Sequence, residues 1–174
     1  MIEINPILPI EIITTGGTIE KSYDETDGTL ENRASFIQRE IIDRLRLPYS
    51  ELHFHPLMSK DSLYMTDEDR AMISAKVKEL SGKGNPILIL HGTDTMTQSA
   101  AQVLRDLSPI GVPIVFTGAM RPLGFEKSDA VQNLTEALLV CRLKPPGVYI
   151  ACHGRVFEAP LVQKNRERLT FEAL

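Results

Sequence analysis

The chain has 174 residues, the length of one domain, and 43% of them are hydrophobic, which is enough for a buried core. The net charge is −4, the isoelectric point is near 5.6, and the sequence shows no basic patch. Nucleic acid is therefore not an expected partner. The clearly apolar runs, such as residues 86–90, are far shorter than the ~20 residues that span a bilayer, so a membrane is not expected either.

A cytoplasmic location is the default expectation. Residues 1–9 carry no basic residue before their apolar stretch, so they lack the layout of a signal peptide. Separately, Cys141 and Cys152 are the only cysteines, and we expect both to be reduced residues that pack in the interior.

Strands and helices are predicted to alternate along the first half of the chain. Strands are expected at 11–14 and 51–56, a polar loop over 16–29, and a helix over 35–45. A second helix begins after Thr66, a hydroxyl cap followed by acidic residues, and runs to about Leu80, where glycines end it.

The second half continues the alternation. Residues 87–90 form a continuous apolar run, typical of a strand that is buried on both faces. Further strands are expected at 114–116 and 148–152, and helices at 97–107 and 129–142, the latter capped by Ser128. Residues 156–164 are expected to form a short hairpin around Ala159-Pro160.

This order predicts a single doubly wound α/β domain, Rossmann- or flavodoxin-like, with a mostly parallel sheet and helices on both faces. Ligands bind such sheets at the carboxyl ends of the strands. The segments expected at that edge are 15–18, 91–95, 117–121 and 153–155.

Thr18 is a candidate nucleophile at the first of these strand ends. Gly16 and Gly17 allow a tight turn and a close approach of a ligand, although a plain turn explains them equally well. The spacings typical of phosphate-binding loops are absent. A threonine hydroxyl needs a base or a strong hydrogen-bond partner, and Tyr23 in the same loop is either that partner or an exposed aromatic residue.

A second set of candidates is Thr93, Asp94 and Lys164. A sharp turn at Gly92 would let the adjacent Thr93 and Asp94 face one pocket, whereas the alternative role of Asp94 is an N-cap. A lysine acts as a base only where burial lowers its pKa, and on the residues alone Lys164 reads as a surface side chain. We expect structural roles for the histidines and no metal site, because no ligand set has suitable spacing.

Three motifs carry a resemblance to a known family. TTGGTIEK (14–21), LHGTDTM (90–96) and TGAMRP (117–122) resemble the signatures of the bacterial-type (type I/II) L-asparaginases in order and approximate spacing. The resemblance implies that Thr18 is the acylated nucleophile and Tyr23 its partner. It also implies a second triad of Thr93, Asp94 and Lys164.

The resemblance further implies how the substrate is bound. Asp94 would hold the substrate's α-amino group. Ser62, in the run 61–66, would bind its α-carboxylate, with Asp61 beside it. The carbonyl of Ala119 would contact its amide nitrogen. Leu63 departs from the family, which usually has Gln or Ser there. The chain also has about half the family's usual length, so residues 1–174 are expected to be an N-terminal-type catalytic domain without the usual C-terminal domain. The Met1 start and compact ending favour a naturally short enzyme over an isolated domain.

The implied reaction is the hydrolysis of L-asparagine to L-aspartate and ammonia through a threonine acyl-enzyme, with no metal and no organic cofactor. The implied partners are the small-molecule substrate and further copies of the chain, as a dimer or tetramer. Two alternatives stay open: a related amidase that acts on glutamine or an amidated carrier, and a sensing or interaction domain without turnover.

Overall fold

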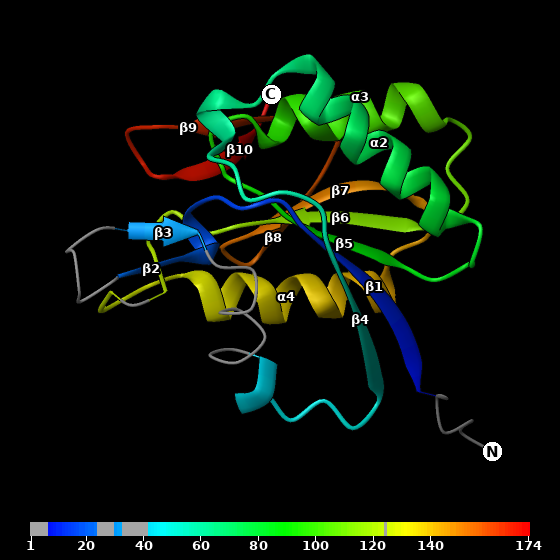
Figure 1. The fold of residues 1–174 in the computed structure, drawn as a ribbon, viewed down its shortest axis with the longest axis horizontal. Helices are drawn as coiled ribbons and strands as arrows, with labels where there is room; N and C mark the ends of the chain where they lie inside the picture. The colour runs from blue at the N-terminus through cyan, green and yellow to red at the C-terminus, as the bar shows by residue number, and fades with distance from the viewer. Residues whose placement is uncertain (1–6, 24–29, 33–41, 124) are drawn as a thin grey trace.

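The computed structural model describes residues 7–23, 30–32, 42–123 and 125–174, and gives only the backbone for residues 20–23, 30–32 and 44. A six-stranded sheet lies at the centre (Figure 1), in the order β4-β1-β5-β6-β7-β8. The first five strands are parallel, and β8 runs antiparallel to β7. In this spatial order the bounds are Ser50–Pro56, Leu8–Thr14, Ile87–Leu90, Pro113–Thr117, Gly147–Cys152 and Arg155–Glu158.

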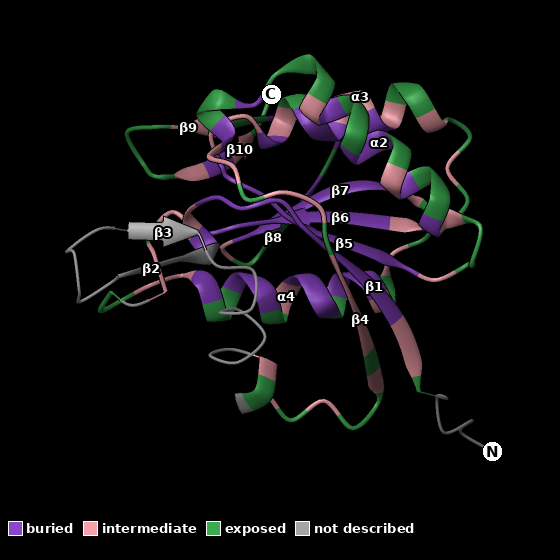
Figure 2. Cartoon of the chain, viewed as in Figure 1, coloured by how far each residue is buried: buried purple, intermediate pink, exposed green. Residues whose placement is uncertain are grey.

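Helices cover both faces of the sheet, as predicted. The helices α2 (Asp67–Ser81) and α3 (Met96–Leu107) pack on one face, and α4 (Ala130–Leu143) packs on the other (Figure 1). Side chains of β5 alternate between the two cores: Ile87 and Ile89 face α2 and α3, whereas Leu88 and Leu90 face α4. This alternation explains why the run is apolar throughout and why every residue of β5 is buried (Figure 2).

The start of α2 agrees with the prediction. The hydroxyl of Thr66 accepts a hydrogen bond from the Asp69 amide at 3.3 Å, and the Asp69 carboxylate accepts one from the Thr66 amide at 2.7 Å. This reciprocal pair satisfies two amides that a helix start leaves without partners. The helix α4 begins at Ala130, one residue later than predicted, with Asp129 at the N-cap. The Ser128 hydroxyl still accepts from the Ala130 amide at 3.2 Å.

The predicted hairpin around Ala159-Pro160 is wrong. The strand β8 turns back onto β7 instead, through His153 and Gly154, which have φ values of 51° and 75°. Two such residues form the tight turn that fits the twist of antiparallel strands. The strand β9 (Val162–Asn165) then pairs with β10 (Thr170–Ala173) in a separate two-stranded sheet.

The segment expected as an irregular loop over 16–29 contains regular structure. A 3-10 turn, η1 (Thr18–Glu20), leads into β2 (Lys21–Tyr23), which pairs with β3 (Leu30–Asn32). The helix predicted over 35–45 lies mostly outside the described residues; its described end forms the 3-10 turn η2 (Ile42–Arg44). Two 3-10 elements are therefore present where neither was predicted.

The two cysteine thiols are free and buried, as expected of packing residues. Among the parts of the chain that the structure describes, every helix is too short or too polar to cross a membrane.

Candidate active site

The turns that follow β1 and β5 lie in direct contact. Gly17 has a φ of +89°, and a Cβ atom there would lie 2.5 Å from the Cα of Gly92. A Cβ atom on Gly92 would in turn lie 2.4 Å from the Oγ of Ser62. No other residue type fits at these two positions without a shift of backbone or of a buried side chain. The segments that carry Thr18, Ser62 and Thr93 therefore meet at the carboxyl edge of the sheet.

His91 fixes the backbone of the turn after β5. Its ring is fully buried, with Nδ1 2.7 Å from the Gly92 carbonyl and Nε2 2.8 Å from the Ser99 hydroxyl. Burial lowers the pKa of His91 to about 4, so the imidazole is neutral at physiological pH. Because a carbonyl only accepts, Nδ1 donates to Gly92 and Nε2 accepts from Ser99.

The next two residues contact a lysine from the C-terminal hairpin. The Nζ of Lys164 in β9 donates to the Oγ1 of Thr93 at 2.7 Å and to the carboxylate of Asp94 at 2.9 Å. Thr93 is buried, and the side chain of Lys164 is only 14% exposed. The surface alternative for Lys164 is therefore wrong: the side chain crosses to the turn after β5.

Asp94 does not cap the following helix. Thr95 is the N-cap residue of α3, and its hydroxyl donates to the Ser62 carbonyl at 2.8 Å. The carboxylate of Asp94 instead accepts from Lys164 and lies 3.3 Å from the guanidinium of Arg166, which is 68% exposed. The contact with Arg166 was not foreseen, because nothing local in the sequence links these two residues.

Thr18 begins η1 directly after the Gly17 turn and is partly buried. Tyr23 ends β2, but its side chain lies outside the described part of the chain. The predicted contact between these two residues thus stays a prediction.

Ser62 is the most informative of the residues expected to bind substrate. It begins the 3-10 turn η3 (Ser62–Tyr64) and is 1% exposed, and its hydroxyl has no hydrogen-bond partner among the described residues. A buried hydroxyl without a partner is costly, which points to a ligand or water in that position. Asp61 accepts from the Leu63 amide at 3.1 Å, and Leu63 itself is 55% exposed.

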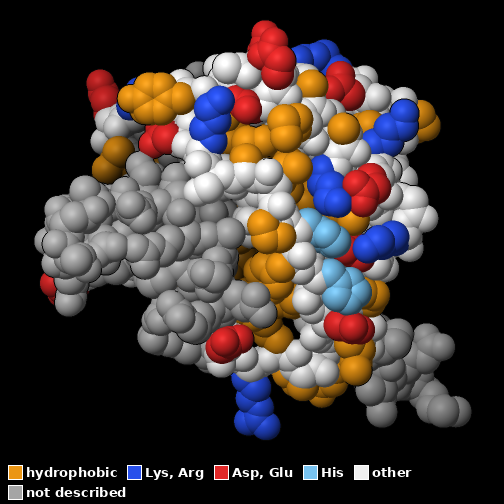
Figure 3. All heavy atoms as spheres, in the orientation of Figure 1, with side chains coloured by type: hydrophobic (Ala, Val, Ile, Leu, Met, Phe, Trp, Pro, Cys, Tyr) orange, Lys and Arg blue, Asp and Glu red, His pale blue; other side chains and the backbone are white. Residues whose placement is uncertain are grey.

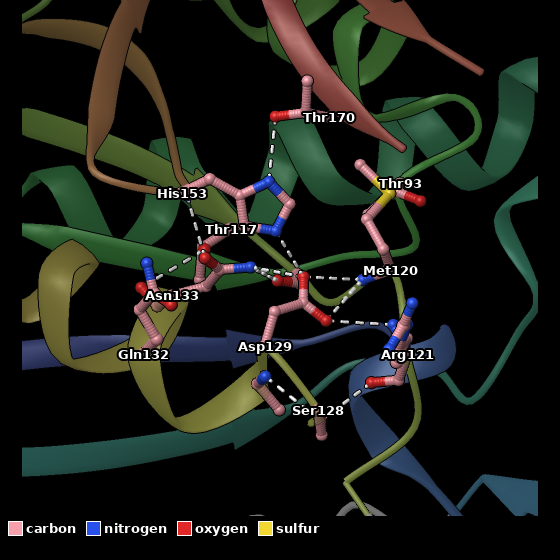
Figure 4. A network of polar contacts seen from close by, with 12 residues as sticks. Thr93, Thr117, Met120, Arg121, Ser128, Asp129, Gln132, Asn133, His153 and Thr170 are labelled. Atoms are coloured by element: carbon pink, nitrogen blue, oxygen red, sulfur yellow. Dashed lines mark hydrogen bonds and ion pairs between the residues drawn. The ribbon is translucent and has the colours of Figure 1, made fainter. Parts of the chain in front are cut away.

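The segment after β6 carries Ala119, which is buried at the same edge. The carboxylate of Asp129 accepts hydrogen bonds from the amides of Met120 at 2.9 Å and Arg121 at 3.0 Å (Figure 4). Burial raises the pKa of Asp129, but these amides and the ring of His153 lower it more, so the net shift is downward. The sequence interpretation missed Asp129 because its position at a helix start already had a local explanation.

One cluster could offer ligand atoms to a metal ion. Among the described residues, Asp129, Cys152 and His153 have ligand atoms within 4.8 Å of one another. The Asp129 carboxylate is, however, surrounded by N–H donors, and burial raises the pKa of Cys152 to about 12, so its thiol stays protonated. This donor set fits a hydrogen-bonded network better than a metal centre.

His53 and His55 share one face of β4, as predicted, and both contact the buried carboxylate of Glu11. The distances are 3.2 Å and 2.6 Å, and Lys83 and Asn85 bind the same carboxylate. Figure 3 shows histidine side chains on this face, bordered by basic and acidic ones. These donors lower the pKa of Glu11 to about 2 against the opposing effect of burial.

Comparison with known proteins agrees with this geometry. The family model described as "Asparaginase, N-terminal" matches residues 9–173. L-asparaginase 1 of Escherichia coli K12 is 34% identical over 163 residues, which are 90% of this chain and 44% of that protein. A glutamyl-tRNA(Gln) amidotransferase component from Methanococcus vannielii is 30% identical over 159 residues, 89% of this chain and 37% of that protein.

Solved structures give the same result. The thermostable L-asparaginase from Thermococcus kodakarensis has a TM-score of 0.88 and 27% identity, over 96% of this chain and 51% of that one. The chain thus spans about half the length of the relatives it matches, or less. Because this family model matches nearly all of its residues and the fold agrees, the chain belongs to the asparaginase family. It corresponds to the part of the family described as N-terminal.

Proposed function

We propose that the protein is an amidohydrolase that converts L-asparagine to L-aspartate and ammonia. The observation that carries the proposal is the contact of the Lys164 ammonium with both Thr93 and Asp94, at 2.7 and 2.9 Å. Thr93 and Asp94 are adjacent in the turn after β5, whereas Lys164 comes from β9, about 70 positions further along the chain, and its side chain is withdrawn from solvent to reach them. Such an arrangement is typical of a hydroxyl group held for proton transfer.

Thr18 is the proposed nucleophile. Its Oγ attacks the carbon of the substrate's side-chain amide, and backbone N–H groups near Thr93 stabilise the oxyanion that forms. The amide nitrogen takes up a proton and leaves as ammonia, which gives an ester between Thr18 and the aspartyl group. Water then attacks this ester, and aspartate leaves with the Thr18 hydroxyl restored. The steps need no metal and no organic cofactor.

The substrate's charged groups would contact residues beside this centre. The buried hydroxyl of Ser62, for which the described part of the chain offers no hydrogen-bond partner, supports its role with the α-carboxylate, next to Asp61. Asp94 would hold the α-amino group, and the carbonyl of Ala119 the amide nitrogen. Because Asp94 already contacts Lys164 and Arg166, we expect weak asparagine binding.

A related substrate is the second candidate. Several relatives bear the name of a glutamyl-tRNA(Gln) amidotransferase, at 29–32% identity. This observation favours an amidase that acts on glutamine or on an amidated carrier. Ammonia release from asparagine and from glutamine, measured side by side with purified protein, separates the candidates; release from neither would contradict both.

We also propose a homo-oligomer in which a second copy covers the outer face of α4. Leu139 and Leu143 are 55% and 70% exposed there, beside a groove of about 510 Å³ that Val156 also lines. Sedimentation velocity of the wild type and of Leu143→Lys tests this. We expect a dimer or tetramer that the variant weakens, and a strictly monomeric wild type would contradict it.

A cytoplasmic location completes the proposal. It is supported by the two free thiols and by one similar solved structure, titled a probable cytoplasmic L-asparaginase from Campylobacter jejuni, with a TM-score of 0.77 and 27% identity.

A further inference from the structure

We propose that Asp129, His153 and Thr170 are positioning residues that couple the segment carrying Ala119 to the hairpin carrying Lys164. The three side chains form a continuous hydrogen-bonded bridge between these two parts of the candidate site (Figure 4). This inference rests on the proposed function for its catalytic consequence, but the bridge itself can be tested without turnover.

The first end of the bridge holds the segment after β6. The Asp129 carboxylate accepts from the amides of Met120 and Arg121, the two residues that follow Ala119. Asn133, fully buried on α4, adds to this end: its side-chain amide donates to the Gly118 carbonyl and to Asp129, both at 2.9 Å. The peptide groups on both sides of Ala119 are thereby fixed to the start of α4.

His153 forms the middle of the bridge. Its Nε2 lies 2.8 Å from the Asp129 carboxylate, and its Nδ1 lies 2.8 Å from the Thr170 hydroxyl. Because a carboxylate only accepts, Nε2 carries the proton, and the ring orientation is set from both sides. The backbone of His153 has a φ of 51°, and its amide donates to Asn133 at 3.0 Å, so the residue is held in an uncommon conformation by the same network.

Thr170 forms the second end. It begins β10, where it pairs with Asn165, and the next pair in register is Phe171 with Lys164. Phe171 is 2% exposed and anchors the hairpin in the core. A hydrogen bond to Thr170 therefore restricts the strand pair from which the Lys164 side chain reaches Thr93 and Asp94.

The test is a double-mutant cycle on ammonia release. Thr170→Val removes the hydroxyl with little change in volume, and we expect kcat to fall roughly 3–10-fold with KM changed less than about twofold. Thr170→Ser should restore kcat to within about twofold. Asp129→Asn breaks the same bridge, so it should lower kcat to a similar extent, and because Asp129 also holds the Ala119 segment, this variant should raise KM as well. Thr135→Val is the matched control, because the exposed Thr135 hydroxyl, as far as the described residues go, bonds within α4 to the Val131 carbonyl.

Coupling is the decisive result. In an Asp129→Asn or His153→Asn background, the Thr170→Val effect on kcat should shrink to less than about twofold. His153→Asn serves if Asp129→Asn does not fold, because asparagine tolerates a positive φ. Independent, multiplicative effects, or a Thr170→Val variant with wild-type kcat, would overturn the bridge.

Amide hydrogen exchange provides a readout that does not need activity. Thr170→Val should speed the exchange of the Met120 and Arg121 amides, which it does not contact, and Thr135→Val should not. If the wild type releases no ammonia but Thr170→Val still speeds exchange of the two amides, the bridge is supported and the proposed function is rejected. If the wild type is active but Thr170→Val leaves the exchange of these amides unchanged, the function is supported and the bridge is rejected.

Discussion

The Nζ of Lys164 lies 2.7 Å from the Oγ1 of Thr93, although 71 positions separate the two residues in the sequence. The contact depends on the separate sheet of β9 and β10, which carries Lys164 to the turn after β5. A long-range contact between a buried hydroxyl and a cation is the feature on which the proposed chemistry depends.

Replacing Lys164 with methionine should abolish most of the turnover. Methionine keeps the length and the apolar stem but removes the ammonium that contacts Thr93 and Asp94, so we expect kcat/KM to fall about a hundredfold or more. Lys78→Met on the exposed side of α2 is the control. Wild-type activity in Lys164→Met would remove the second triad from the mechanism.

Replacing Glu11 with glutamine should destabilise the fold. The fully buried carboxylate accepts from two histidines, a lysine and an amide, and we expect a loss of roughly 1.5–3 kcal/mol in the free energy of unfolding. Urea unfolding measures it. Glu51→Gln, whose side chain is 65% exposed on the same sheet edge, should change stability by less than ~0.5 kcal/mol. Equal effects of the two variants would contradict the special role of Glu11.

Stability should fall on the acid side for two reasons. The pKa of Glu11 is lowered from 4.5 to about 2, so its contribution is complete above pH 4.5 and is lost as the pH falls towards 2. The pKa of His91 is lowered from 6.5 to about 4, so its contribution is lost as the pH falls from 6.5 to 4. Unfolding measured across this range should show both losses, and Glu11→Gln should remove only the lower one.

The contribution of His53 to stability has the opposite pH dependence. Its hydrogen bonds to Glu51 and Glu11 raise its pKa above 6.5, so its contribution is complete below pH 6.5 and is lost as the pH rises through the higher, folded-state value. His53→Asn should therefore reduce the loss of stability on the alkaline side while leaving the His91 step in place. If stability falls equally on the alkaline side in this variant, His53 does not contribute to the pH dependence of stability.

Much of the fold could be predicted because its signals are local. The apolar run of β5 and the capping box at Thr66 each specify an element from a few neighbouring residues. The prediction of a hairpin around Ala159-Pro160 was wrong because β8 pairs with β7, the strand directly before it in the chain. The His153-Gly154 turn that joins these two strands was a local signal that the sequence interpretation overlooked.

The site was predictable to a smaller extent. The turns after β1 and β5 stood out as small and hydroxylated residues at strand ends, which a parallel sheet brings to one edge. Lys164 gave no such signal, since its burial depends on a hairpin that folds against a distant turn, and only the family resemblance selected it. Residues 153–155 were expected at the functional edge, but neither Asp129 nor His153 was selected as a site residue, because each has an ordinary local role, as a helix cap and a turn residue.

The central claim is covalent hydrolysis at Thr18, and trapping the intermediate tests it most directly. Wild-type protein is mixed with asparagine, quenched in acid during turnover and analysed by mass spectrometry of its peptides. We predict an aspartyl adduct on the peptide that contains Thr18, no adduct in Thr18→Val, and less than about a tenth of wild-type ammonia release in Thr18→Val. An adduct on another residue, or a Thr18→Val variant that keeps wild-type turnover, would contradict the account.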